Sequence, residues 1–261
     1  MKASAISAQE MDFQNTGIDG NGKKFILKNS SVAIPGETGV MDYILLTQAN
    51  SDTSFFYQDV IVKKKVVLHF TMGYLTGDIA TLTTPNNHVS VPFVVGRDGK
   101  IYNLFGSKYW SYHLGPKAVG GNKQMSGSSI GIEISNIGPL KKIGDNLVTT
   151  YADSDVYCTM VETQYYQALA IPYRGFSYYA AFTDAQYESV TNLLRYLTAT
   201  YGINRQFVDE AARYNTLPQN DFVNFNGIVS HVNCRTDKVD IGHAFDWDRV
   251  INGLASGNTA V

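Results

Sequence analysis

Short apolar runs bounded by turn-forming residues recur along the first half of the chain and predict β-strands. Residues 62–70 form one such run, and residues 89–95 form another. The second run leads through Asp98-Gly99 into a further apolar stretch, residues 101–105. An Asp-Gly pair between two apolar runs is typical of a β-hairpin, because glycine readily adopts the positive φ that the turn requires.

Residues 128–135 alternate between isoleucine and small or polar side chains. Successive side chains of a strand point to opposite faces of its sheet. The pattern therefore predicts a strand that buries its isoleucines and directs Glu133 to the other face.

The second half of the chain predicts two helices. Thr183 and Gln186 have the spacing of a capping box, in which each side chain bonds to the other residue's main chain at the start of a helix. Apolar residues follow at helical spacing as far as Tyr201, and Gly202 is a natural stop. Residues 246–254 have the pattern of a last helix.

Together these elements predict an α/β fold, in which a mixed central β-sheet is flanked by helices. We expect residues 61–256 to form this main domain, and residues 1–60 to form an N-terminal extension packed on it. Residues 257–261 would be a tail. The stretch from 136 to 179 has little periodicity, so long loops are expected there.

Composition narrows the class of protein. The net charge of −2 over 261 residues gives no basic surface for nucleic acid. No apolar run approaches the roughly 18 residues that indicate a membrane-spanning helix, so membrane insertion is not expected. The first residues lack the apolar segment of a signal peptide, which predicts a protein made in the cytoplasm. Two cysteines do not make a disulfide framework, and we expect a monomer.

Polar residues near the ends of three strand-like runs suggest a catalytic metal site. His69 and His231 each end such a run, Glu133 lies near the end of the third, and Lys238 and Asp240 follow His231 closely. A catalytic zinc takes three protein ligands and an open position, and His69, His231 and Asp240 make a suitable set. Glu133 could then act as general base, and Lys238 could stabilise charge on a carbonyl oxygen, as in hydrolysis of an amide or ester.

Other interpretations of the same residues remain open at this point. A single histidine at a strand end is more often a hydrogen-bonded structural residue than a ligand. Lys238 and Asp240 could form an exposed ion pair that contributes little to stability. Cys234 and His243 compete with Asp240 as the third ligand, because thiolate and imidazole also suit zinc.

Five motifs occur in an order that resembles the zinc-dependent N-acetylmuramoyl-L-alanine amidases, a family that includes phage lysozyme-like amidases and peptidoglycan recognition proteins. Each motif is weak alone, but the five in order are specific. The resemblance covers about residues 62–250. The motifs are residues 67–71, 89–102, 111–115, 129–134 and 230–247.

The resemblance implies zinc in a surface cleft, bound by His69, His231 and Asp240, with Glu133 and Lys238 as catalytic residues. It also implies cleavage of the amide bond between N-acetylmuramic acid and L-alanine. His113 matches a family histidine that lies near the cleft without usually being a ligand.

The sequence departs from the family pattern at several positions. Val91 stands where other members have tyrosine, and Pro92 stands where histidine is frequent. The spacing from His231 to Asp240 is one residue shorter than in some members, which makes Asp240 the least secure ligand.

Peptidoglycan or its muropeptide fragments are the implied partners. A phage or prophage endolysin, reaching the cell wall after release or export, suits the absence of a signal peptide. Two alternatives are a recognition module that binds peptidoglycan without cutting it and an amidase that acts on intracellular muropeptides. Retention of the ligand set, Glu133 and Lys238 argues against the recognition module.

Overall fold

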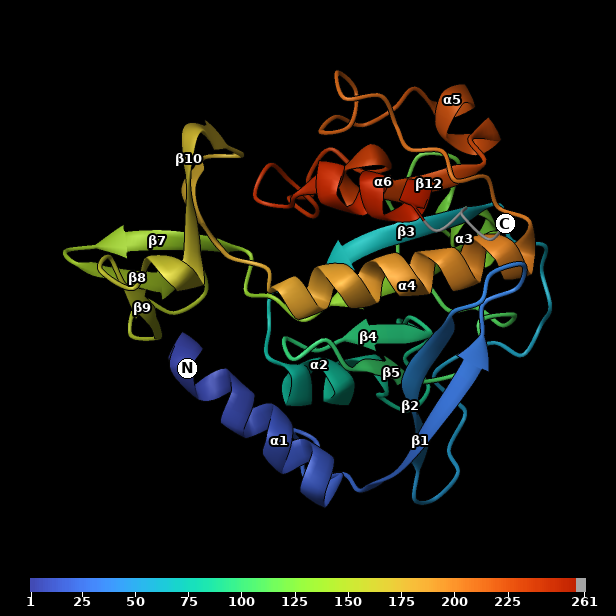
Figure 1. Ribbon diagram of the computed structural model, residues 1–261, viewed down its shortest axis with the longest axis horizontal. Helices are drawn as coiled ribbons and strands as arrows, with labels where there is room; N and C mark the ends of the chain where they lie inside the picture. Colours follow the sequence, from blue (N-terminus) through green and yellow to red (C-terminus); the bar gives the residue numbers. More distant parts are fainter. Residues whose placement is uncertain (257–261) are drawn as a thin grey trace.

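A seven-stranded mixed β-sheet forms the centre of the computed structural model, which describes residues 1–256 (Figure 1). Its middle strands run parallel to one another, whereas the β1–β2 and β4–β5 pairs are antiparallel. In spatial order the strands are β1 (Phe25–Ala33), β2 (Val40–Gln48), β5 (Ile101–Asn103), β4 (Phe93–Val95), β6 (Ser129–Ile134), β3 (Lys65–Phe70) and β12 (Gly227–Ser230).

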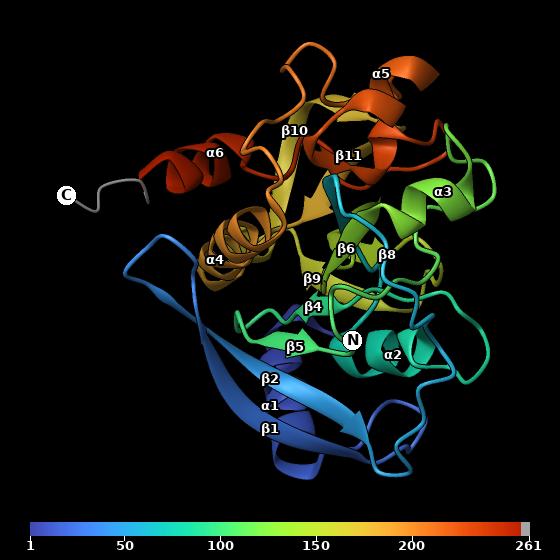
Figure 2. The ribbon, with the colours of Figure 1, turned by 90° about the vertical axis from the view of Figure 1, so that its right-hand side faces the viewer.

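Helices cover both faces of this sheet (Figure 2). Helices α4 (Asp184–Tyr201) and α6 (Trp247–Ser256) pack on one face. The opposite face is covered by α1 (Ile6–Thr16), α2 (Leu75–Leu82), α3 (Asn122–Gly127) and α5 (Gln219–Asn224). The predicted α/β class, with a mixed central sheet flanked by helices, is confirmed.

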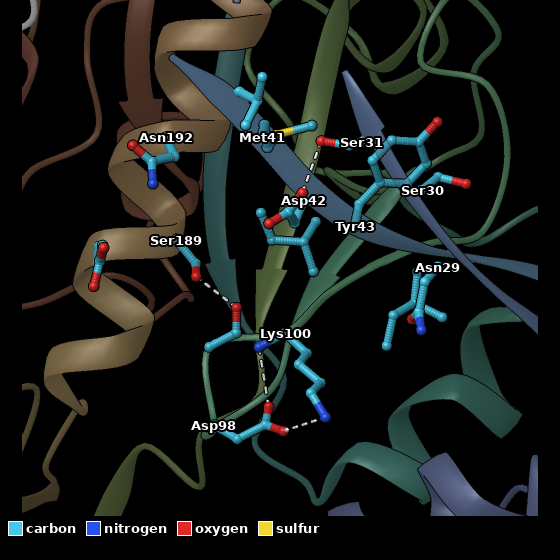
Figure 3. A pocket seen from close by; sticks show the side chains of 15 residues that line it. Asn29, Ser30, Ser31, Met41, Asp42, Tyr43, Asp98, Lys100, Ser189 and Asn192 are labelled. Atoms are coloured by element: carbon cyan, nitrogen blue, oxygen red, sulfur yellow. Dashed lines mark hydrogen bonds and ion pairs between the residues drawn. The ribbon is translucent and has the colours of Figure 1, made fainter. Parts of the chain in front are cut away.

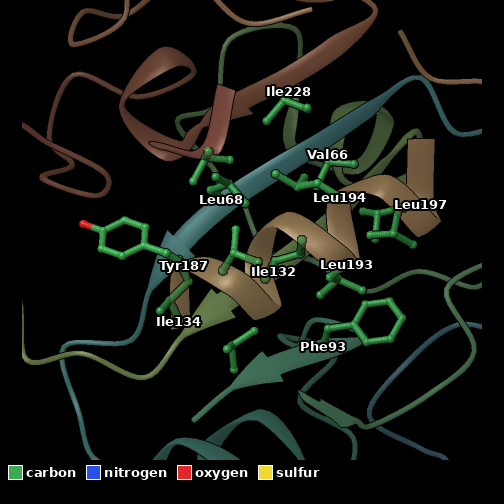
Figure 4. Close-up of a cluster of buried hydrophobic side chains, with 14 of the residues drawn as sticks. Val66, Leu68, Phe93, Ile132, Ile134, Tyr187, Leu193, Leu194, Leu197 and Ile228 are labelled. Atoms are coloured by element: carbon green, nitrogen blue, oxygen red, sulfur yellow. The ribbon is translucent and has the colours of Figure 1, made fainter. Parts of the chain in front are cut away.

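Helix α4 begins and ends as predicted. The Thr183 side chain accepts a hydrogen bond from the Gln186 main chain, and the Gln186 side chain accepts one from the Thr183 main chain. Gly202 ends the helix in the left-handed conformation, which glycine adopts without a steric penalty. The buried face of α4 packs against β3, β4, β6 and β12 (Figure 4), with Tyr187, Leu193, Leu194 and Leu197 meeting Val66, Leu68, Phe93, Ile132, Ile134 and Ile228.

The central strands also follow the sequence pattern. The isoleucines of β6 are buried, and the Asp98-Gly99 turn joins β4 to β5 as an antiparallel pair. Gly99 has a φ of 82°, as the hairpin required. Strands β1 and β2 lie within the predicted N-terminal extension, and β2 adds to the edge of the sheet by pairing with β5.

The expectation of long loops between residues 136 and 179 is wrong. A second sheet of five antiparallel strands occupies this stretch (Figure 1). Four of its strands have only four or five residues, and the first and fourth strands are largely exposed, so the chain carries little of the alternation that marks a half-buried strand. They are β7 (Pro139–Ile143), β8 (Asn146–Thr149), β9 (Val156–Thr159), β10 (Tyr166–Tyr173) and β11 (Phe176–Ala180).

Short 3₁₀ turns occur at Ala3–Ala5, Thr163–Tyr165 and His231–Asn233. Within residues 1–256, no helix combines the length and the apolar character needed to cross a lipid bilayer. The predicted tail, residues 257–261, lies outside the described residues.

Candidate metal centre

The candidate site lies where three parallel strands end. His69 is the penultimate residue of β3, and Glu133 is its register partner in β6. His231 follows the last residue of β12 directly. Because β6, β3 and β12 are neighbouring parallel strands, their carboxyl ends meet at one edge of the sheet. The sheet therefore brings together residues separated by more than 160 positions.

Three potential ligand atoms converge at this edge. The Nδ1 atoms of His69 and His231 are 2.9 Å apart. The Oδ2 atom of Asp240 lies 2.9 Å from Nδ1 of His231 and 3.2 Å from Nδ1 of His69. All three residues are buried. The structure thus brings together the three residues that the sequence assigned to the metal.

The outer nitrogen of each histidine has a separate partner. Nε2 of His69 lies 3.0 Å from Nδ1 of His113, and Nε2 of His231 lies 3.0 Å from the carbonyl oxygen of Leu114. A carbonyl only accepts hydrogen bonds, so His231 donates through Nε2, which leaves its Nδ1 directed at the cluster.

The electrostatics favour a neutral imidazole beside an ionised carboxylate. Burial, reinforced by the charge of His231, lowers the pKa of His69 to about 4. Burial alone would raise the pKa of Asp240, but His231 and His69 hold it well below its usual value. At neutral pH the neutral His69 ring and the ionised Asp240 therefore direct a nitrogen and a carboxylate oxygen to the point that Nδ1 of His231 also faces.

This donor set fits a divalent zinc ion. Lone pairs that face one another at 2.9–3.2 Å need a proton or a cation between them. Imidazole and carboxylate are common zinc ligands, and a set of three leaves a position open for water or substrate. The outer partners of both histidines are of the kind that orient metal-bound imidazoles.

The competing third ligands lie elsewhere. The Cys234 thiol is buried and donates a hydrogen bond to the carbonyl oxygen of His231. Burial and the negative charge of Asp240 raise its pKa to about 12, so a thiolate is disfavoured. The His243 ring stacks on Tyr214, with 3.6 Å between ring centroids. The group that could hold a metal contains His69, His231 and Asp240.

Glu133 and Lys238 interact electrostatically with residues of this centre: Asp240 raises the pKa of Glu133, and Lys238 lowers the pKa of His69. Glu133 is partly buried, and its Oε2 atom is shielded from solvent without a hydrogen-bond partner among the described residues. Burial and the negative charges of Asp240 and Asp78 raise the pKa of Glu133 well above its usual value, and the positive charge of Lys238 opposes them. Lys238 is partly exposed.

Sequence reasoning missed Asp78 and the main-chain carbonyl of Leu114. Asp78 is buried in α2 and accepts a hydrogen bond from Ser135, the residue after β6. Burial raises its pKa to about 6. Nothing in the local sequence of α2 points to this contact, because it depends on how the helix packs against the sheet.

Two surface pockets differ in their relation to the centre. A pocket of about 780 Å³ lies on the α4 side of the sheet, between α4, the β1–β2 pair and the β4–β5 turn (Figure 3). His69 points to the other face, because its neighbours Leu68 and Phe70 pack in the cluster with α4. A second pocket, of about 710 Å³, includes Thr236 and His243, which are close to Asp240 in sequence. Its other lining residues are Tyr173, Arg174, Ala211, Tyr214, Asn215 and Thr216.

The fold and the site define an α/β protein with a candidate metal centre at the ends of its parallel strands. A family model described as N-acetylmuramoyl-L-alanine amidase matches residues 59–243. This match spans most of the chain, and the protein belongs to that family.

Several solved structures resemble this one. AmiD from E. coli, solved with anhydro-N-acetylmuramic acid-L-Ala-D-gamma-Glu-L-Lys, is 20% identical over 75% of this chain and 59% of its own, with a TM-score of 0.48. AmpDh3 from Pseudomonas aeruginosa is 14% identical over 75% and 61%, with a TM-score of 0.45. LysC from Clostridium intestinale URNW is 14% identical over 77% and 92%, with a TM-score of 0.40. The match thus spans less than two thirds of AmiD and of AmpDh3. No curated protein sequence matches the chain.

Proposed function

We propose that the protein hydrolyses the amide bond between N-acetylmuramic acid and L-alanine in peptidoglycan or its muropeptide fragments. Zinc would be held by His69, His231 and Asp240 in a surface cleft. The observation that carries the proposal is the convergence of two imidazole nitrogens and one carboxylate oxygen within 4.8 Å of one another, in a chain of the amidase family. Retention of this group disfavours a recognition module without catalysis.

A bound zinc ion would supply Lewis-acid chemistry, which polarises the scissile carbonyl and lowers the pKa of water. The chain's own residues prepare the site for it. The ionised carboxylate of Asp240 beside the neutral ring of His69 favours a divalent cation at this point. Hydrogen bonds to the outer nitrogens hold both rings in place.

Glu133 would act first as general base and then as general acid. A carboxylate whose pKa is raised holds a proton more tightly, so it can accept a proton from the attacking water and return it to the leaving amine of L-alanine. Its Oε2 has no hydrogen-bond partner among the described residues, so no other group of the fold competes for that oxygen. Lys238 would stabilise the negative charge that develops on the carbonyl oxygen.

Digestion of purified peptidoglycan, followed by mass spectrometry, tests the proposal. Stem peptides that begin with a free L-alanine amino group should appear, without new reducing sugar ends. A chelator should stop the release and added zinc should restore it. A glycosidase would yield reducing ends, and a recognition module would bind the polymer without releasing peptides. Release from intact sacculi would suit an endolysin, whereas activity on soluble fragments alone would suit an amidase of muropeptides.

Paired variants test the ligand set. His231→Ala should lose both bound zinc and activity, because it removes one of three convergent donors. Cys234→Ser should keep its zinc, because the thiol bonds to a main-chain carbonyl and lies outside the cluster. Metal analysis by mass spectrometry reads out both variants. Full zinc content in the His231 variant would contradict the assignment.

A further inference from the structure

The pocket of about 780 Å³ between α4, the β1–β2 pair and the β4–β5 turn, here called the α4 pocket, is separate from the candidate metal centre (Figure 3). It lies on the face of the central sheet that His69 points away from. One of its walls is the β1–β2 pair, which precedes the stretch matched by the family model, residues 59–243. The α4 pocket is therefore a feature that this chain adds to the matched domain.

The strand pairing explains why the sheet is open at this point. Strand β2 pairs with β5 at Ile44 and Leu45. The two strands are parallel and β5 begins at Ile101, so residues 40–42 of β2 lie beyond the start of β5, beside the turn that leads into it. This divergence leaves a space, and α4 closes it from the other side.

Two contacts hold the walls of the α4 pocket in place. The Ser189 hydroxyl, on α4, donates a hydrogen bond to the main-chain carbonyl oxygen of Gly99 in the β4–β5 turn. Glu37, in the connection between β1 and β2, forms ion pairs with Arg195 of α4 and with Arg205. A ligand would therefore meet a pocket whose walls are already joined, as is usual for small-molecule sites.

The lining of the α4 pocket carries hydrogen-bonding groups that the fold does not use. The side chains of Asn29 on β1, Ser30 on β1 and Asn192 on α4 form no hydrogen bond with another described residue. Each amide both donates and accepts hydrogen bonds. Because the two asparagines lie on opposite walls, a ligand that fills the pocket meets both amides (Figure 3).

The charged groups of the lining disfavour an anionic ligand. Asp42 and Asp98 contribute carboxylates, and Lys100 contributes an ammonium group. Lys100 already pairs with Asp98 at 3.8 Å, and the Ser31 hydroxyl donates to Asp42 at 2.7 Å. Because these ionised groups have partners within the protein, the ligand needs no charge of its own.

Apolar surface completes the lining of the α4 pocket. Met41, Tyr43 and Ile101 contribute to it, and Tyr43 is half-buried. A tyrosine ring offers an apolar face together with a polar hydroxyl. A pyranose sugar has the matching character, because its hydroxyl groups project around the ring and its C–H groups form an apolar face. An acetamido group on the sugar would add the donor and acceptor that suit the two asparagines.

We propose that the α4 pocket binds a neutral saccharide with acetamido groups, through Asn29 and Asn192 on its two walls and with Tyr43 against a sugar ring. In an enzyme that acts on peptidoglycan this saccharide is the glycan strand. That identification rests on the proposed function, whereas the preference for a neutral sugar rests on the lining alone. The α4 pocket and the metal centre face opposite sides of the sheet, so this second site tethers the enzyme to the polymer and raises its effective concentration there.

A titration of the protein with the tetramer of N-acetylglucosamine, in the presence of chelator, tests the proposal. The tetramer is neutral, carries acetamido groups and has no bond to L-alanine, so binding is measured without turnover. Main-chain ¹⁵N–¹H spectra should shift around Asn29, Lys100 and Asn192. Asn29→Ala and Asn192→Ala should each weaken binding by about 5-fold, the usual effect of one lost hydrogen bond, and the double variant by about 25-fold.

A matched control separates the α4 pocket from general effects of the substitution. Asn220→Ala replaces an exposed asparagine of α5, outside the lining of the α4 pocket, and should leave the affinity unchanged. Asn29 is exposed and Asn192 is partly exposed, so both variants should fold, and thermal melting checks this.

Three results would overturn the proposal. They are shifts confined to the surroundings of the metal centre, wild-type affinity in the folded double variant, and tighter binding of inorganic phosphate or of free stem peptide than of the tetramer at the α4 pocket. Failure of the proposed function would look different. In that case the protein would bind the tetramer at the α4 pocket and release no peptide from peptidoglycan when loaded with zinc.

Discussion

Replacing Glu133 with glutamine should lower turnover and raise stability at the same time. The substitution keeps the shape of the side chain but removes its ability to accept a proton. The carboxylate is held beside Asp240 and Asp78, and its Oε2 is buried without a partner among the described residues. A group in such surroundings destabilises the folded protein whenever it is ionised. The same surroundings suit it for proton transfer.

The expected loss of turnover and the expected gain in stability can each be given a size. Loss of a general base lowers turnover by roughly 10²–10⁴-fold, which corresponds to about 2.7–5.5 kcal/mol of activation free energy. For a carboxyl that is a tenfold weaker acid in the folded protein than in the unfolded chain, ionisation costs about 1.4 kcal/mol of unfolding free energy. For a chain of this length each kcal/mol shifts the melting temperature by roughly 2–4 °C. Glu133→Gln should therefore melt at a higher temperature than wild type at pH 8.

The gain in stability of Glu133→Gln over wild type should increase as the pH rises. The pKa of Glu133 is raised in the folded protein above its ordinary value of 4.5. Between the two values the unfolded carboxyl ionises while the folded one holds its proton, so the free energy of unfolding of wild type falls as pH rises. The glutamine side chain does not ionise, so the free energy of unfolding of the variant does not fall with pH for this reason. The gap in melting temperature should be small near pH 4.5 and should widen toward pH 8.

Steady-state turnover and thermal melting at several pH values read out both effects on the same samples. Glu188→Gln is the matched control, because this carboxylate is exposed on α4 and should change neither quantity. Near-normal turnover in Glu133→Gln would refute its role as base. A lower melting temperature than wild type at pH 8 would refute the claim that its ionised form is costly.

Three further predictions concern stability and metal. Thr183→Ala removes the capping box of α4 and should lower the free energy of unfolding by about 0.5–2 kcal/mol in urea titrations, with zinc content unchanged. Burial raises the pKa of Glu10 to about 7, so the unfolding free energy of wild type should fall by up to about 3 kcal/mol between pH 4.5 and 7. Thermal melts of Glu10→Gln should show a weaker dependence on pH. Free zinc at 100 times its Kd should stabilise the wild type by about 2.7 kcal/mol over the chelated protein, and Asp240→Asn should lose most of that gain in calorimetry.

The parts of the fold that could be predicted are those with a strong local signal. The isoleucine alternation of β6, the Asp98-Gly99 turn and the capped helix α4 each carry their information within a few neighbouring residues. The ligand candidates could be found because His69 and His231 both end apolar runs. In a parallel sheet such ends share one edge, so position along the chain implies proximity in space.

The parts that escaped prediction depend on tertiary contacts. Helix α1 buries a glutamate, Glu10, which accepts hydrogen bonds from the main chain of Arg97 and Asp98, so its buried face does not look apolar in the sequence. In the second sheet β7 and β10 are largely exposed, so the sequence of neither strand shows a clear buried face. The carbonyl of Leu114 acts through its main chain, and main-chain contacts leave no mark on residue type.

The loop from His231 to Asp240 explains why the short spacing of these residues does not move Asp240 away from the candidate metal centre. The main-chain N–H of Val232 donates to the carbonyl oxygen of Asp240 at 2.9 Å, which closes the loop directly beside the two side chains that converge on the centre. At the start of the loop, the side chain of Asn233 accepts a hydrogen bond from the main chain of Ser230. The position of Asp240 is therefore set by how the ends of the loop are joined, and not by the number of residues between them. A loop closed in this way can lose or gain a residue in its exposed middle, around Asp237, while the carboxylate continues to face His231.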